Sequence, residues 1–229
     1  MDSPLTSTVA FTIGPLAIHW SVVTTWGIMA ALALLSHLIT RRLTMGPGRA
    51  QAILEMLVET LDSEITSTIV GDPARFRALI GTLLLFVLTA NWSSLIPGVE
   101  PPTAHLETDA ALAVLVFGAS VTWGIRAKGL WGWLSGFAKP SWVMIPLNLL
   151  EQITRHFSLM VRLFGNVMSG VFVIGIVLSL AGLLVPIPFM ALDLLTGAVQ
   201  AYIFATLALV FIGSAVSEES ETTSQKDPD

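Results

Sequence analysis

Long apolar runs alternate with short polar segments along most of this chain. A helix needs about 20 mostly apolar residues to cross the hydrocarbon core of a bilayer. Three runs have the length of a single crossing, although the second and third only just reach it, and two later runs are clearly longer. We expect membrane helices at residues 20–40, 78–96, 110–126, 142–183 and 188–215.

The last two runs are too long to cross a bilayer upright. As straight helices they would extend roughly 65 and 42 Å, against a hydrocarbon core of about 30 Å. The sequence LLVPIP at residues 183–188 joins them through a short connection, and its prolines stop a helix. The pattern therefore predicts a long, strongly inclined hairpin of two membrane helices.

One more helix is expected at residues 49–69, after the helix-breaking sequence MGPG. Its apolar positions recur every fourth residue, at Ile53, Leu57, Leu61 and Ile65. Acidic residues such as Asp62 face away, so attraction to anionic lipid is a weak explanation, and we expect docking on the membrane surface or on a partner helix. The predicted fold class is an all-α polytopic membrane protein, with residues 1–216 as a single membrane domain.

Composition supports a membrane protein and excludes several functions. The chain of 229 residues is 54% hydrophobic and 12% charged, whereas a soluble domain carries roughly 25% charged residues. A formal net charge of −5 and the lack of a P-loop motif argue against nucleic acid and against direct nucleotide binding. The chain has no cysteine, and its four histidines lack metalloprotease spacing, so we expect neither a metal nor a cofactor.

The distribution of Lys and Arg predicts the orientation in the membrane. Positive residues lie at 41–77 and 126–139, whereas residues 1–19 and 97–109 contain none. Cytoplasmic loops of membrane proteins are enriched in Lys and Arg. We therefore expect the N-terminus outside, and the polar tail 217–229 in the cytoplasm.

Polar residues form a stripe along each arm of the predicted hairpin. On the first arm, spacings of three and four place one face at Glu151, Arg155, Ser158, Arg162 and Asn166. The second arm has a similar face at Asp193, Thr196 and Gln200. A charge at the bilayer centre costs ~2.5–3.5 kcal/mol on insertion scales, so such residues indicate function. Asn166 and Gln200 could instead be hydrogen-bonding links between helices.

Structural explanations stay open for the charged members of these stripes. Arg162 could form a salt bridge with Asp193 that holds the hairpin together. Arg155 could pair with Glu151, four residues earlier, or extend toward the cytoplasmic surface. His156 is not on the stripe, and a satisfied or interfacial histidine explains it better.

A permanent charge at Arg162 has a specific use in ion transport. Arginine stays charged even at low dielectric, so it can oppose a proton without carrying one away. Facing a carboxylate on a moving partner, it would favour the ionised carboxylate and interrupt a continuous proton wire. Asp193 and Gln200 toward the hairpin turn, and Ser158 and Glu151 toward the cytoplasm, could then line two separate half-paths.

Several motifs resemble one family. RLFGN at residues 162–166, PLNLLEQ before it and QAYIFATLALVFIGSA at 200–215 resemble the a subunit of rotary ATP synthases, especially its chloroplast and cyanobacterial branch. NWSSLIPG at 91–98 resembles the same family, and the similarity runs from about residue 75 to 216. The resemblance implies a non-catalytic stator subunit of the inner (plasma) membrane. By the same resemblance, the subunit is expected to pass H⁺ or Na⁺ through two offset half-channels. Its expected partners are a c-ring, b-type peripheral stalk subunits and the rest of the complex.

The resemblance also implies roles for individual residues. Arg162 is similar to the essential arginine of the family, which faces the ion-binding carboxylate of the c-ring. Asn166 and Gln200 are similar to its polar companions in the outer half-channel, and Ser158 to the serine one turn before the arginine. Glu151 is not part of the resemblance, and only its place on the same helical face assigns it with Ser158 to the inner half-channel.

One departure from the family pattern concerns the outer half-channel. Many relatives carry an ionisable residue five positions after FGN, where this chain has Val171. Asp193 lies seven residues before Gln200 and supplies a carboxylate on the other arm, at an expected offset of about 9 Å along the axis. Such outer-path chemistry is compatible with the ATP-hydrolysing, ion-pumping branch called N-ATPases.

Two other functions are compatible with parts of this pattern. A self-contained ion channel or secondary transporter could use the same polar stripes, but it would need a substrate-sized site within one chain or its homo-oligomer. An intramembrane hydrolase could use Ser169, but no histidine follows it in the sequence, and His156 shares no helical face with it.

Overall fold

A computed structural model describes residues 9–13, 16–41, 49–69, 72–96, 99, 101–136, 142–182 and 184–217. The longer elements are the strands β1 (Val9–Ile13) and β2 (Leu16–His19) and the helices α1 (Trp20–Thr40), α2 (Arg49–Thr68), α3 (Ala74–Trp92), α4 (Leu106–Gly136), α5 (Ile145–Ala181) and α6 (Ile187–Ser217). Three single-turn 3₁₀ helices are η1 (Ser93–Leu95), η2 (Pro102–Ala104) and η3 (Trp142–Met144).

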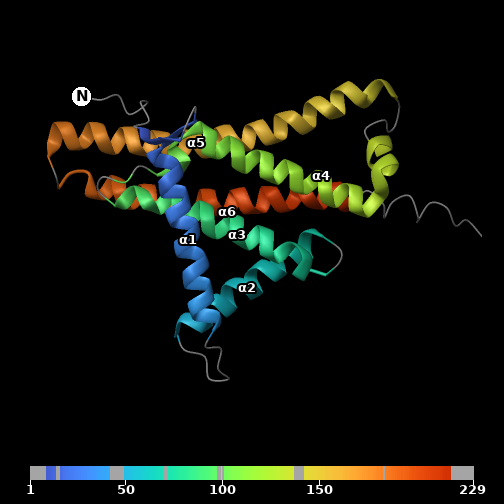
Figure 1. Cartoon of the computed structure of the whole chain (residues 1–229), viewed down its shortest axis with the longest axis horizontal. Helices are drawn as coiled ribbons and strands as arrows, with labels where there is room; N and C mark the ends of the chain where they lie inside the picture. Colours follow the sequence, from blue (N-terminus) through green and yellow to red (C-terminus); the bar gives the residue numbers. More distant parts are fainter. Residues whose placement is uncertain are drawn as a thin grey trace, which may run out of the picture.

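The predicted fold class is confirmed. Five helices, all except α2, are long and apolar enough to cross a membrane. The helices α3, α4, α5 and α6 run lengthwise beside one another, whereas α1 projects from them at a steep angle (Figure 1). The polar tail that begins at residue 217 lies outside the described residues, apart from its first residue.

The helices begin and end differently from the apolar runs. Helix α3 begins at Ala74 and α4 continues to Gly136, because a helix can extend beyond the segment that is apolar enough to meet lipid. Within α4, Gly129 has a φ of 73°, a conformation that favours glycine, and it breaks the regular helix. The short antiparallel hairpin of β1 and β2 was not predicted.

Helix α6 is central to the packing, because it contacts α2, α3, α4 and α5. Buried side chains from all six described α-helices meet in one core, among them Ile65, Val87, Val116, Leu163 and Phe204. On α6, the buried residues Ala201, Ala205 and Ala208 let neighbouring helices approach closely, as small residues do in membrane bundles.

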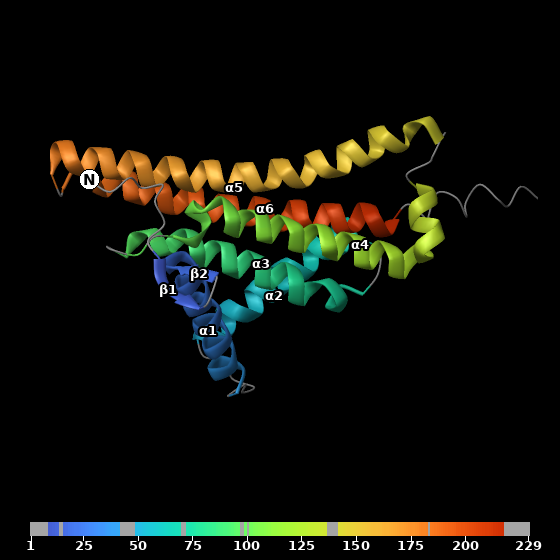
Figure 2. The ribbon, with the colours of Figure 1, turned by 45° about the horizontal axis from the view of Figure 1, so that its top comes forward.

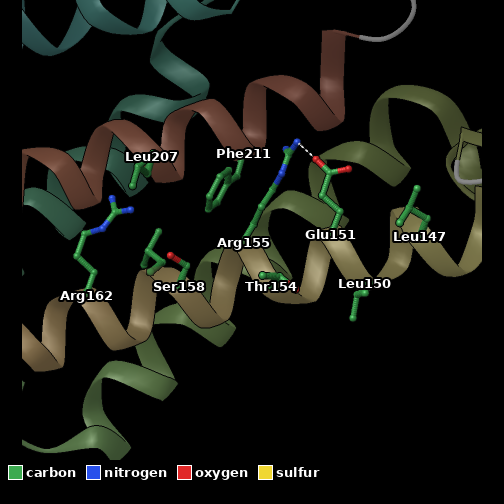
Figure 3. A pocket seen from close by; sticks show the side chains of 10 residues that line it. Leu147, Leu150, Glu151, Thr154, Arg155, Ser158, Arg162, Leu207 and Phe211 are labelled. Atoms are coloured by element: carbon green, nitrogen blue, oxygen red, sulfur yellow. Dashed lines mark hydrogen bonds and ion pairs between the residues drawn. The ribbon is translucent and has the colours of Figure 1, made fainter.

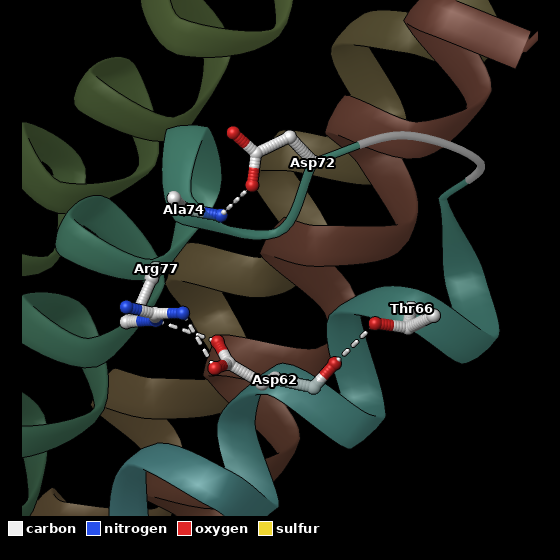
Figure 4. A network of polar contacts seen from close by, with 5 residues as sticks. All are labelled: Asp62, Thr66, Asp72, Ala74 and Arg77. Atoms are coloured by element: carbon white, nitrogen blue, oxygen red, sulfur yellow. Dashed lines mark hydrogen bonds and ion pairs between the residues drawn. The ribbon is translucent and has the colours of Figure 1, made fainter.

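The amphipathic helix α2 docks on its own chain, against α3 and α6. Leu61 and Ile65 are buried there, whereas Ile53, expected on the same face, is 68% exposed. Asp62 was expected to face away, but Arg77 of α3 donates two hydrogen bonds to it, at 2.6 and 2.5 Å (Figure 4). The cationic group across the interface explains this difference, since it draws the carboxylate inward.

Helices α5 and α6 form the long hairpin that the sequence predicts, and they run side by side over much of their length (Figure 2). Helix α5 ends at Ala181, and Gly182 follows with a φ of 77°, in the left-handed region where glycine carries no Cβ penalty. The first turn of α6 is closed by a 2.9 Å hydrogen bond from the Met190 N–H to the Pro186 carbonyl.

Candidate functional site

Arg162 lies on α5 with its side chain exposed to the groove between α5 and α6. Its guanidinium group points toward Leu207 of α6 (Figure 3). Within the described part of the chain it has neither a hydrogen bond nor an ion pair. The structural explanation by a salt bridge with Asp193 is therefore wrong, and the cation is exposed in this groove without a counter-charge among the described residues.

We call the groove around this residue the arginine groove. It has a volume of ≈ 630 Å³. Its lining consists of Leu147, Leu150, Glu151, Thr154, Arg155, Ser158, Leu159, Arg162, Leu207 and Phe211. The structure thus brings together the predicted polar face of α5 from Glu151 to Arg162. Arg155 and Glu151 form an ion pair within it, as the structural explanation for Arg155 required (Figure 3).

A second groove, the aspartate groove, lies farther along the hairpin toward its turn and has a volume of ≈ 180 Å³. Its lining consists of Asn166, Ser169, Gly170, Val173, Ile174, Phe189, Leu192, Asp193 and Thr196. Asn166 of α5 and Asp193 of α6 therefore share one groove, although they come from different arms. Gln200 is buried on α6 and lines neither of these two grooves.

Asp193 is closely packed against the other arm of the hairpin. A Cβ atom added to Gly170 would collide with its carboxylate group. On its other side, the Ser94 hydroxyl donates a 3.2 Å hydrogen bond to the carboxylate Oδ2. Gly170 directly precedes Val171, so the expected axial offset of about 9 Å between Asp193 and Val171 is wrong. The two arms are therefore not paired symmetrically about the turn.

The end of α3 positions the α6 backbone near Asp193. Asn91 is buried, and its amide donates a 2.9 Å hydrogen bond to the Gly197 carbonyl and accepts one of 2.8 Å from Thr103. The indole of Trp92 donates to the Leu194 carbonyl at 3.1 Å. No chemical role was predicted for these three residues from the sequence. Their signal was a cluster of polar side chains at the end of an apolar run.

His156 has a structural role in the packing. Its ring is buried between Phe117 and Phe211, at centroid distances of 5.0 and 5.1 Å. Its Nδ1 lies 2.8 Å from the Gln152 carbonyl. In the part of the chain that the structure describes, no three His, Asp or Glu side chains come together as metal ligands would.

Comparison with known proteins agrees with this arrangement. The sequence pattern of the family described as "ATP synthase A chain" matches residues 22–213. The chain is 56% identical to ATP synthase subunit a 2 of Bradyrhizobium sp., over 94% of this chain and 96% of that protein. It is 46% identical to ATP synthase subunit a of Albidiferax ferrireducens, over 88% of each chain. It is 41% identical to ATP synthase subunit a 1 of Hahella chejuensis, over 97% of this chain and 94% of that one. On this identity and coverage, the chain belongs to the ATP synthase A chain family, the a subunits of F-type ATP synthases.

Proposed function

We propose that this stator subunit passes H⁺ or Na⁺ through two offset half-paths, to and from the carboxylates of a c-ring. The observation that carries the proposal is the arrangement of two grooves along one hairpin. Arg162 lines the arginine groove at its end nearer the hairpin turn, and the aspartate groove begins one helical turn farther along, at Asn166. A fixed cation between two grooves that each contain several polar side chains would prevent a continuous ion path and force the ion onto the rotor.

The exposed position of Arg162 supports a role toward a partner. An arginine inside a membrane is costly to keep, and it stays charged at any ordinary pH. Because Arg162 has no counter-ion in the described part of its own chain, the missing negative charge belongs to another subunit. A c-ring carboxylate that rotates past α5 has the required charge, and the cation would favour its ionised form.

Each groove supplies one half-path in this proposal. Asp193 and Asn166 in the aspartate groove, with Gln200 nearby on α6, carry the ion on the outer side. Ser158 and Glu151 in the arginine groove carry it on the cytoplasmic side. The ion pair between Glu151 and Arg155 leaves the carboxylate half exposed, at 54%, and therefore accessible to water.

The remaining features of the proposal concern the assembly. Residues 1–216 form one domain of the inner (plasma) membrane, with the N-terminus outside and the tail 217–229 in the cytoplasm. The chain performs no bond chemistry and binds no nucleotide, nucleic acid or cofactor itself. Its partners are the c-ring, b-type peripheral stalk subunits and the rest of the complex.

The experiment that tests this function compares the chain alone with the complete complex. Each is reconstituted in liposomes, and ion flux is recorded with and without Na⁺, a protonophore and ATP. We expect the tagged chain to copurify with the c-ring, the complex to pump, and the isolated chain to pass no ions. Saturable ion flux through the isolated chain would instead support a self-contained channel or transporter.

A further inference from the structure

Asp109, in the first turn of α4, is a fully buried carboxylate that the proposed half-paths do not use. Its exposed fraction is 0%, and neither carboxylate oxygen has a hydrogen-bond partner among the described residues. An ionisable residue kept inside a membrane protein at such cost marks an ion pathway by default. Stabilisation of the helix N-terminus does not require burial, because Glu107 in the same turn is acidic and exposed.

The surroundings of Asp109 connect it to the aspartate groove. The turn η2 lies immediately before α4 and packs against α1, α3, α4 and α5. Its fully buried residue Thr103 donates to Asn91, which in turn donates to Gly197 of α6. One turn before Gly197 on α6 lies Asp193.

A second connection runs along the end of α3. Ser94 follows Asn91 by three residues and donates to Asp193. Helix α3 packs against α6, whereas η2 contacts α3, α4 and α5 and so lies between the elements that carry these groups. Thr103, six residues before Asp109, and Ser94 thus each bond toward the part of α6 that carries Asp193, through Asn91 and Gly197 in the first case and directly in the second.

We infer that Asp109 is a second relay carboxylate of the outer half-path, which binds the transported monovalent cation and exchanges it with Asp193. This inference rests on the proposed function. Asp109 is the last residue of the segment 97–109, which lacks Lys and Arg and is expected to lie on the outer side of the membrane. An ion from the outside would therefore reach Asp109 before it reaches Asp193.

The test uses the complete complex in liposomes, with ATP-driven uptake followed separately as H⁺ and as Na⁺ movement. Asp109→Asn keeps the size of the side chain but removes its ion-binding charge, and should lower the rate roughly 10²-fold in an assembled complex. Asp109→Glu retains a carboxylate and should keep a substantial part of the rate. The matched control is Glu107→Gln, which removes one charge from the same helical turn at an exposed position and should leave the rate unchanged.

Two results would overturn the inference. One is an assembled Asp109→Asn complex that pumps at the rate of Glu107→Gln. The other is the loss of assembled complex for both Asp109→Asn and Asp109→Glu, because the carboxylate would then serve packing.

Arg162→Ala and Asp193→Asn, measured alongside, separate this inference from the proposed function. If both lose transport while Asp109→Asn pumps normally, only the role of Asp109 is wrong. If both pump normally, the proposed function fails and the relay fails with it.

Discussion

The carboxylate of Asp193 on α6 occupies the space in which a Cβ atom of Gly170 on α5 would lie. A carboxylate from the second arm thus lies directly against the backbone of the first, next to the position where many relatives are expected to carry their own ionisable residue. The absence of a side chain at Gly170 is therefore part of how Asp193 is positioned.

Gly170→Ala should displace the carboxylate and lower ion transport by the assembled complex, because a methyl group and Asp193 cannot share this space. Gly175→Ala is the matched control on the same helix, where an added Cβ would meet nothing within 4 Å. ATP-driven pumping in liposomes measures both. In an Asp193→Gly background the Gly170→Ala change should have no further effect, and equal losses in the two backgrounds would disprove the coupling.

Asp193→Asn should lower transport strongly, roughly 10²-fold, while the complex still assembles, since the amide keeps the size of the side chain but cannot relay an ion. The measurement is pumping per assembled complex. Normal pumping would assign the outer path to Asn166 and Gln200.

Because Asp193 lies beside Gly170, Val171→Glu should partly restore transport to the Asp193→Gly variant. If transport does not recover, this aspartate itself is required.

Asn91→Ala should destabilise the contact between α3 and α6 by about 1–2 kcal/mol, because it removes an interhelical hydrogen bond and leaves the buried Thr103 hydroxyl without its acceptor. Thermal unfolding of the detergent-solubilised complex measures the effect. Ser93→Ala is the control. Among the described residues, the buried Ser93 hydroxyl donates only to the Ala90 carbonyl, three residues earlier in the same segment. An equal loss of stability in both variants would contradict the linking role of Asn91.

The orientation can be tested with single cysteines, because the chain has none of its own. Thr103, although in an expected outer loop, is fully buried and unsuitable, whereas Leu106 is 46% exposed. Leu106→Cys should react with membrane-impermeant reagents from outside, and Ala127→Cys only from the cytoplasmic side. Labelling of Leu106→Cys from the cytoplasm would reverse the assignment of the two half-paths.

Hydrophobic length and polar spacing were sufficient to predict the five long helices and the face from Glu151 to Arg162. A polar stripe on one helix depends only on the helical period, so it can be found without knowing the neighbours. The long hairpin was predictable for a similar reason, since two apolar runs flank a short sequence with prolines.

Contacts between elements far apart in the sequence could not be predicted in this way. Asp193 was placed too far from Val171, because the expected offset assumed that the two arms pair symmetrically about the turn. Ser94 meets Asp193 across 99 residues of sequence, and no local pattern encodes such a pair. Asp109 was noted only as the last residue of a segment without Lys and Arg, because no local pattern shows that the folded chain buries it completely.

The central claim is that Arg162 acts as a permanent, exposed cation between the two half-paths. ATP-driven ion uptake by the assembled complex tests this claim most directly. The variants are Arg162→Lys and Arg162→Ala. The control is Arg155→Ala, which changes an arginine in the same groove that is already paired with Glu151. We predict that both Arg162 variants assemble but lose coupled pumping. Alanine removes the positive charge. Lysine fails because its ammonium group lacks the planar fork of arginine and can lose its charge when buried. Arg155→Ala should retain most of the pumping rate. Pumping by Arg162→Lys at close to the rate of the unmodified complex would contradict the claim.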